Sequence, residues 1–198
     1  PGFELFLHKN EKRELYILHS GMGLVAAASG TQFLIDKYDV DLIVNFGVVG
    51  ALTEEMKKLK TCIIHKVVHY RYDASEFLPL EVGQLPDHSV KILLNPELID
   101  MALQIDKELK PACCCSGDKF VATKEEKMKI HEQFKGDVCD MEAAAIALTC
   151  ETNDVPVIIL KAVSDSLGGG AEEFFKELNK AALKALQIAD KIIENFVK

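Results

Sequence analysis

Two mainly apolar runs that lack regular polar alternation constrain the fold most strongly. They cover residues 41–46 and 155–160. A strand with one face in water alternates apolar and polar side chains, whereas runs like these are typical of strands covered on both faces. Helical patterns separate the extended segments along the chain, as in α/β proteins. We therefore predict a three-layer α/β fold in which helices flank a central mixed, mostly parallel twisted sheet.

The same patterns locate the other elements. We predict extended segments at residues 3–8, 14–19, 41–46, 61–72, 112–115, 137–140 and 155–160. We predict helices at residues 24–38, 96–107, 124–134, 141–150 and 175–196. The last helix carries one apolar stripe, formed by Phe175, Leu178, Ala182, Ala185, Ala189, Ile192 and Phe196. No repeat or Pro/Ser-rich linker divides the chain, so we expect a single domain over residues 1–198.

Charge and hydropathy exclude several classes of partner. The chain has 23 basic and 31 acidic side chains, a formal net charge of −8. Nucleic acids and anionic membranes bind basic surfaces, so neither is an expected partner. No run approaches the roughly 18 apolar residues of a membrane span. The first residues show no basic stretch followed by an apolar one, so we expect no signal peptide.

The six cysteines do not form a recognisable disulfide set or metal site. Three of them are consecutive, at residues 113–115, and in a strand their side chains alternate between faces. The chain contains no Cys-x-x-Cys pair, and its histidines do not lie at helical spacing from the cysteines. Small apolar side chains in a reduced compartment explain them better. We therefore expect a cytoplasmic protein without a bound metal ion.

Two carboxylates follow predicted strands, where open α/β sheets bind their ligands. Asp165 comes shortly after the run at 155–160, and partial desolvation there would suit a proton donor. Its position alone is explained equally well by a helix or turn cap. Glu142 alone is better explained as a charge that stabilises the start of a helix. Together, however, two carboxylates on one rim suit sugar chemistry, in which one protonates a leaving group and the other stabilises positive charge on the ring.

Two weaker signals concern substrate binding. The segment Ser20-Gly21-Met22-Gly23 leaves free backbone amides at a helix start, which suits an anion or a hydroxyl. An ordinary strand-to-helix turn explains it as well, and no Gly-Lys-Ser/Thr follows to make a P-loop. Phe120 could stack on a base, although an isolated phenylalanine more often lies in a core.

Six segments, in this order and spacing, resemble the nucleoside phosphorylase and nucleosidase superfamily. They are residues 20–23, 41–50, 83–86, 116–120, 140–143 and 162–165. Within the superfamily the sequence is most similar to the 5′-methylthioadenosine/S-adenosylhomocysteine nucleosidases, from about Glu14 to the C-terminus. The resemblance implies a phosphorylase/hydrolase-like fold and hydrolysis of a purine nucleoside into base and ribose moiety. It implies no metal or organic cofactor, and a homodimer or higher homo-oligomer in which a neighbouring subunit closes the pocket.

The resemblance also implies roles for single residues. Asp165 would be the acid that protonates N7 of the departing purine, with Ser164 orienting it. Phe120 would stack on the base, and the backbone of Val121 would contact the purine edge. Glu142 would accept hydrogen bonds from the ribose hydroxyls. The other substrate-binding residues implied are Ser20, Gly21, Gly47, Met141 and Lys161.

The sequence departs from the family at the nucleophile. The family begins with a strand that ends in an acidic cluster, one of whose glutamates activates the attacking water, and this sequence starts after that strand. Val48 stands where the nucleosidases have a small hydroxyl residue. Lys161 stands in place of an arginine, which keeps the charge and loses the forked geometry. The leaving-group and ribose functions are therefore kept, whereas the site of the nucleophile is altered.

Two alternatives to hydrolysis stay open from the sequence. Phosphorylases place an arginine where this chain has Asn45, which favours water as the acceptor, but Lys161 and Arg71 leave a phosphorylase as the second hypothesis. A non-catalytic nucleoside-binding protein is the third. The missing water-activating carboxylate and Val48 favour it.

Overall fold

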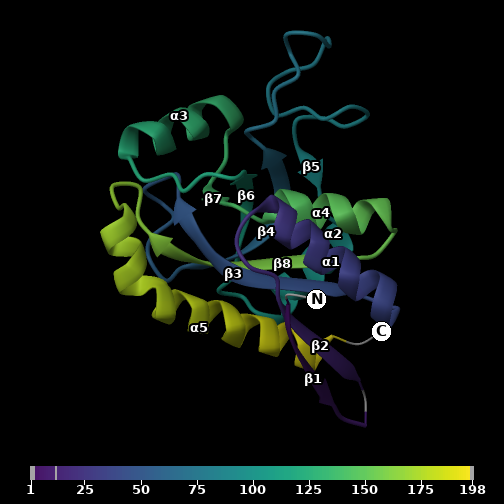
Figure 1. Ribbon diagram of the computed structural model, residues 1–198. Helices are drawn as coiled ribbons and strands as arrows, with labels where there is room; N and C mark the ends of the chain where they lie inside the picture. The colour runs from purple at the N-terminus through teal and green to yellow at the C-terminus, as the bar shows by residue number, and fades with distance from the viewer. Residues whose placement is uncertain (1–2, 12, 197–198) are drawn as a thin grey trace.

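The computed structural model describes residues 3–11 and 13–196 (Figure 1). Its strands are β1 (Glu4–Lys9), β2 (Glu14–His19), β3 (Ile43–Ala51), β4 (Thr61–His69), β5 (Ile92–Leu93), β6 (Lys110–Ser116), β7 (Val138–Asp140) and β8 (Val157–Asp165). Its helices are α1 (Leu24–Tyr38), α2 (Pro96–Ile105), α3 (Lys124–Phe134), α4 (Ala143–Thr152) and α5 (Ala171–Asn195). The predicted helices at 24–38 and 124–134 match α1 and α3.

The central sheet is mixed and closes on itself. Its strand order is β5-β4-β6-β7-β3-β8, and β4 also pairs with β8. The long pairings β3–β8 and β4–β6 are parallel, as is β6–β7, whereas β3–β7, β4–β5 and β4–β8 are antiparallel. Helix α5 lies along β3 and β8, and α1 and α4 pack against each other on the other side (Figure 1). The predicted fold class is therefore confirmed.

The strand β8 forms the centre of the core. All of its residues from Val157 to Asp165 are buried, because β3 and β4 pair with its two edges and helices cover it. The uninterrupted apolar run in the sequence reflects this double coverage. The carboxyl-terminal end of the strand carries the polar pair Ser164 and Asp165 into the same buried environment.

Three predicted strand ends were wrong by three residues or more. The segment predicted at 61–72 ends at His69, as β4. The strand β3 continues to Ala51, five residues past its predicted end, so Gly47 and Gly50 lie inside it. The strand β8 continues to Asp165, five residues past its predicted end. The strands β3 and β8 extend each other, because they remain paired up to Gly50 opposite Asp165. The backbone hydrogen bonds of this pairing outweigh the weak strand preference of glycine.

The apolar stripe of α5 was partly wrong. Ala185, Ala189 and Ile192 are buried as predicted, but Phe175 is 74% exposed. The buried face in the first half of the helix instead includes Ala181. The adjacent Phe174 is half-buried and packs edge-to-face on Phe120, with 5.2 Å between ring centroids.

The hairpin of β1 and β2 forms a two-stranded sheet of its own, separate from the central sheet (Figure 1). Its two strands agree with the predicted extended segments. Among the described residues, no helix is both long enough and apolar enough to span a lipid bilayer.

The buried position of β8 predicts a large effect of truncation. Leu160 is fully buried there, and we expect Leu160→Ala to lower the free energy of unfolding by about 3 kcal/mol through lost burial and a residual cavity. The matched control is Leu183→Ala on α5, where the side chain is 54% exposed and the loss should stay below about 0.5 kcal/mol. Urea denaturation followed by circular dichroism measures both. Equal losses would contradict the central position of β8.

Candidate active site

The buried carboxylate of Asp165 lies at the end of β8. Its Oδ1 accepts a hydrogen bond from the Ser164 hydroxyl at 2.8 Å, and its Oδ2 accepts one from Lys127 Nζ at 2.5 Å. Ser164 is fully buried and its hydroxyl also lies 3.1 Å from the Val49 carbonyl oxygen on β3. The two oxygens of Asp165 are thereby fixed in orientation.

Lys127 is a residue of this site that the sequence analysis missed. It lies on α3, and Ile130 and Phe134, three and seven residues further along the helix, are buried on the same face. A lysine in line with buried apolar residues at helical spacing is the signal that could have found it. A buried ammonium needs a charged or strongly polar partner, and Asp165 supplies one.

A second buried pair lies beside the first. Lys161 Nζ on β8 is 2.9 Å from Asp140 Oδ2 at the end of β7. Burial disfavours both charges, but each favours the other: the pKa of Asp140 is lowered by the Lys161 ammonium, and the pKa of Lys161 is raised by the Asp140 carboxylate. Asp140 also accepts hydrogen bonds from the Glu142 and Ala143 amides, and so holds the start of α4 in place.

Glu142 is the N-cap residue of α4 and is half-buried. Its Oε1 accepts a hydrogen bond from the Gly23 amide at 2.9 Å. Burial raises the pKa of the Glu142 carboxyl, and the neighbouring Asp140 charge adds to this, while the Gly23 amide and Lys161 oppose it. Glu142 is thus a carboxylate with one oxygen anchored to the start of α1.

The amides at the start of α1 are not all free, contrary to expectation. Glu142 accepts a hydrogen bond from the Gly23 amide, and Asp118 Oδ1 accepts one from the Leu24 amide at 2.7 Å. The helix dipole favours these negative charges. The segment that was predicted to hold an anion or a hydroxyl therefore also binds two carboxylates of its own chain.

The strand β3 lies between β7 and β8 in the sheet and carries glycine opposite two charged residues of β8. Gly50 lies opposite Asp165 and Gly47 lies opposite Lys161 in the β3–β8 register. A Cβ atom at Gly50 would lie 3.0 Å from Asp165 Oδ2, and one at Gly47 would lie 3.5 Å from Lys161 Nζ. The absence of side chains here lets the charged groups approach the strand closely.

The remaining predicted residues differ in exposure. Phe120 is 39% exposed, so it lies outside the core, whereas the adjacent Val121 is buried. Met141 and Ser20 are half-buried, and Gly21 is exposed.

In the described part of the chain, no group of three or more His, Cys, Asp or Glu side chains is arranged to hold a metal ion. All six cysteines are buried thiols, and burial raises the pKa of Cys139 beside Asp165 to about 12.

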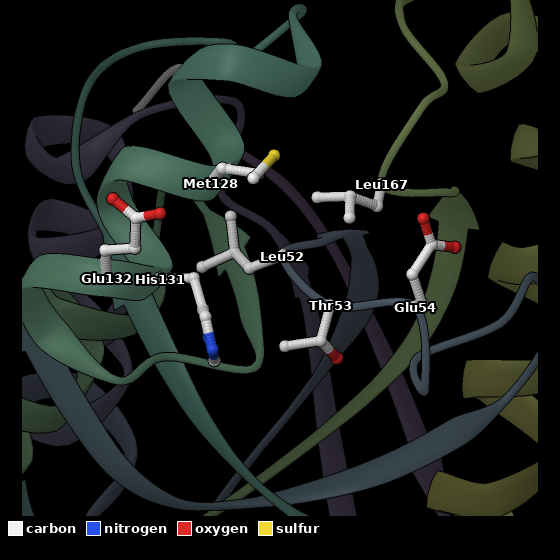
Figure 2. Close-up of a pocket in the computed structure, with 7 residues that line it drawn as sticks. All are labelled: Leu52, Thr53, Glu54, Met128, His131, Glu132 and Leu167. Carbon is white, nitrogen blue, oxygen red and sulfur yellow. The ribbon is translucent and has the colours of Figure 1, made fainter.

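A hollow of about 210 Å³ lies between α3 and the segments that follow β3 and β8, as Figure 2 shows. Its lining residues are Leu52, Thr53, Glu54, Met128, His131, Glu132 and Leu167. None of the predicted site residues is among them. A second hollow, of about 640 Å³, lies between the β1–β2 hairpin and the end of α5 and also contains none. We call the charged residues on or just after β7 and β8 the strand-end cluster: Asp140, Glu142, Lys161 and Asp165. With its buried charges, this cluster is chemically the stronger candidate site.

Comparison with known proteins agrees with this fold. A sequence profile of the phosphorylase superfamily matches residues 1–197. The chain belongs to this superfamily. It is 35% identical over 190 residues to a 5′-methylthioadenosine/S-adenosylhomocysteine nucleosidase of Staphylococcus aureus strain JH9, covering 93% of this chain and 83% of the relative. The predicted family is thus confirmed, and the relative is named a nucleosidase, a class of enzyme that hydrolyses N-glycosidic bonds.

Solved structures of other superfamily members share the fold closely. A Helicobacter pylori 5′-methylthioadenosine/S-adenosylhomocysteine nucleosidase, solved with a pyrrolidine inhibitor, is 25% identical with a TM-score of 0.94, over 98% of this chain and 86% of that one. A Neisseria meningitidis nucleosidase with methylthio-immucillin-A is 27% identical with a TM-score of 0.92, over 98% and 87% of the two chains.

The close approach at Gly50 predicts a specific sensitivity. In Gly50→Ala the new methyl group meets Asp165 and Cys139, which cannot move freely because Asp165 is held by Ser164 and Lys127. We expect the free energy of unfolding to fall by about 2 kcal/mol through overpacking. Gly168→Ala is the control, since nothing lies within 4 Å of a Cβ there. Urea denaturation that gives the same stability for both variants would contradict this packing.

Proposed function

We propose that this superfamily member hydrolyses the N-glycosidic bond of 5′-methylthioadenosine or S-adenosylhomocysteine, releasing adenine and the ribose moiety. The register of β3 carries the proposal. Asp165 lies at the level of Gly50, whereas Lys161, whose charge interacts with Glu142, lies at the level of Gly47. Three residues of strand span about 10 Å, which is enough to place the base and the sugar of one nucleoside along β3. The curated nucleosidase relatives support the same reaction.

Asp165 is the acid at the base end. The N-glycosidic bond breaks with positive charge developing on the ribose ring, and the purine leaves more easily once N7 carries a proton. Asp165 supplies that proton, with Ser164 fixing the orientation of its carboxyl group. The exposed ring of Phe120, packed edge-to-face on Phe174, provides a surface on which the purine stacks, and Val121 borders its edge.

Glu142 acts at the sugar end. With Oε1 anchored to the Gly23 amide, its Oε2 accepts hydrogen bonds from the ribose hydroxyls. Its negative charge also stabilises the ring cation that forms as the bond breaks. Met141 packs beneath the ribose, and Gly47 leaves room for it next to Lys161.

Electrostatics at this end favour water over phosphate. The Lys161 ammonium is neutralised by Asp140, and Glu142 adds a further negative charge close by. A phosphate dianion placed there would meet two carboxylates and one cation, an unfavourable balance in a partly buried site. This balance supports hydrolysis rather than phosphorolysis.

The assembly and the compartment follow from the same proposal. The resemblance to the nucleosidases implies that a neighbouring subunit closes the pocket over the substrate, so we include a homodimer in the proposal. The six buried thiols suit a reducing compartment, which supports the cytoplasm.

A nucleoside panel tests the reaction directly. The protein is incubated with 5′-methylthioadenosine, S-adenosylhomocysteine, adenosine and inosine, with and without phosphate, and free base and sugar products are quantified by chromatography. We expect adenine and unphosphorylated sugar from the first two substrates, independent of phosphate. Formation of a ribose 1-phosphate would show a phosphorylase, and binding without base release would show a non-catalytic protein; either contradicts the proposal.

Removal of the acid is the matching mutational test. Asp165→Asn should lower the rate of adenine release at least about 10²-fold, because an amide cannot donate the proton. It also leaves Lys127 without its anionic partner and therefore destabilises the fold. Asp106→Asn is the matched control, since Asp106 is another buried carboxylate paired with a lysine, Lys191, far from the site at the end of α2. Equal turnover in the two folded variants would remove Asp165 from the mechanism.

A further inference from the structure

Lys127 is the largest of the side chains that are wholly buried in the described chain, with 0% exposure. An ammonium group in such a place is unfavourable unless its charge and its donors are all matched. Lys127 Nζ has three acceptors: Asp165 Oδ2 at 2.5 Å, the Ser166 carbonyl oxygen at 2.7 Å and the Gly169 carbonyl oxygen at 2.9 Å. A lysine has three N–H donors, so every one is used.

The three acceptors belong to Asp165 and to the segment that directly follows it, residues 166–170. The other side of this segment is held by Glu173 on α5, whose carboxylate accepts hydrogen bonds from the Ser166 amide and hydroxyl. Glu173 pairs in turn with Lys58, and although burial opposes it, these contacts lower the pKa of Glu173 to about 2. The chain just after the proposed acid is therefore tied to two different helices.

We propose that Lys127 is a positioning residue for glycosidic cleavage, which fixes the Asp165 carboxyl group and stabilises the carboxylate that remains after proton donation. The inference rests on the proposed function. In the step concerned, the bond between ribose C1′ and purine N9 breaks, and its electron pair stays with the purine. The Asp165 proton passes to N7, and the negative charge left on Asp165 faces the Lys127 ammonium. Water adds to C1′ of the ribosyl cation and loses a proton, and the uptake of one proton returns Asp165 to its acid form.

The other groups around this pair do not compete with Lys127. Cys139 on β7 lies beside Asp165, but burial keeps it a neutral thiol by raising its pKa to about 12. Ser164 on β8 donates a neutral hydrogen bond. The charge of Glu173 on α5 is directed at Ser166 and Lys58. Lys127 is thus the cation in direct contact with Asp165 among the described residues.

A purely structural lysine would act differently from a positioning one. Loss of a structural tie lowers stability but leaves the chemistry of each folded molecule unchanged. Loss of a cation that stabilises the product carboxylate removes an interaction that strengthens as the proton leaves Asp165. It therefore lowers kcat with little effect on KM.

The test measures kcat and KM for 5′-methylthioadenosine at neutral pH in the full chain. Lys127→Met keeps the length of the side chain and removes its charge. We expect kcat to fall about 10²-fold and KM to change less than about threefold. The control is Lys191→Met, which removes the partner of Asp106 and should leave kcat and KM unchanged.

Each outcome decides between the two roles. A folded Lys127→Met variant with wild-type kcat would overturn the inference. Should that variant fail to fold, Lys127→Arg decides: it retains the cation with altered geometry, so we expect a kcat at least about fivefold lower than that of the wild type, with little change in KM. Wild-type kcat in Lys127→Arg would overturn the positioning role. Wild-type protein that released no base would overturn the proposed function itself. Base release at the same kcat by the wild type and by Lys127→Met would overturn this inference alone.

Discussion

A buried carboxylate is stable only when a cation or several donors compensate its charge, and the strand ends of this protein satisfy that constraint twice. Asp140 pairs with Lys161, and Asp165 pairs with Lys127. Neither pair connects neighbours in sequence: each joins elements that meet only in the folded chain. Removing one partner of such a pair leaves an unpaired buried charge, which in general destabilises a protein by about 3–5 kcal/mol. The charged residues of the site and the stability of the fold are therefore linked.

The two ion pairs differ in the charge that they leave available at the two ends of the proposed site. Lys161 neutralises Asp140 next to Glu142, so the proposed sugar end of the site keeps a net negative character that suits an oxocarbenium-like ring and disfavours phosphate. At the proposed base end, Lys127 faces the carboxylate to which we assign the role of proton donor. The glycines of β3 let both pairs approach one strand, along which we propose that the nucleoside is oriented.

Much of this could be predicted from the sequence, because local patterns decide it. The buried strand β8 and the helix α1 followed from apolar runs and helical periodicity, and the motif order pointed to the superfamily. The extension of β3 through Gly47 and Gly50 could not be predicted, since glycine normally ends a strand and only the pairing with β8 continues it. Lys127 was missed for a similar reason. On a charged helix a lysine is expected in water, and only tertiary packing shows that it lies beside Asp165.

The central claim is that the purine leaves after accepting a proton at N7 from Asp165. The most direct measurement compares 5′-methylthioadenosine with its 7-deaza analogue, in which a C–H group replaces N7 and cannot accept that proton. We expect adenine release from the parent compound, no base release from the analogue, and competitive inhibition by the analogue because it still stacks and binds through its ribose. Cleavage of both compounds at the same rate would contradict the claim.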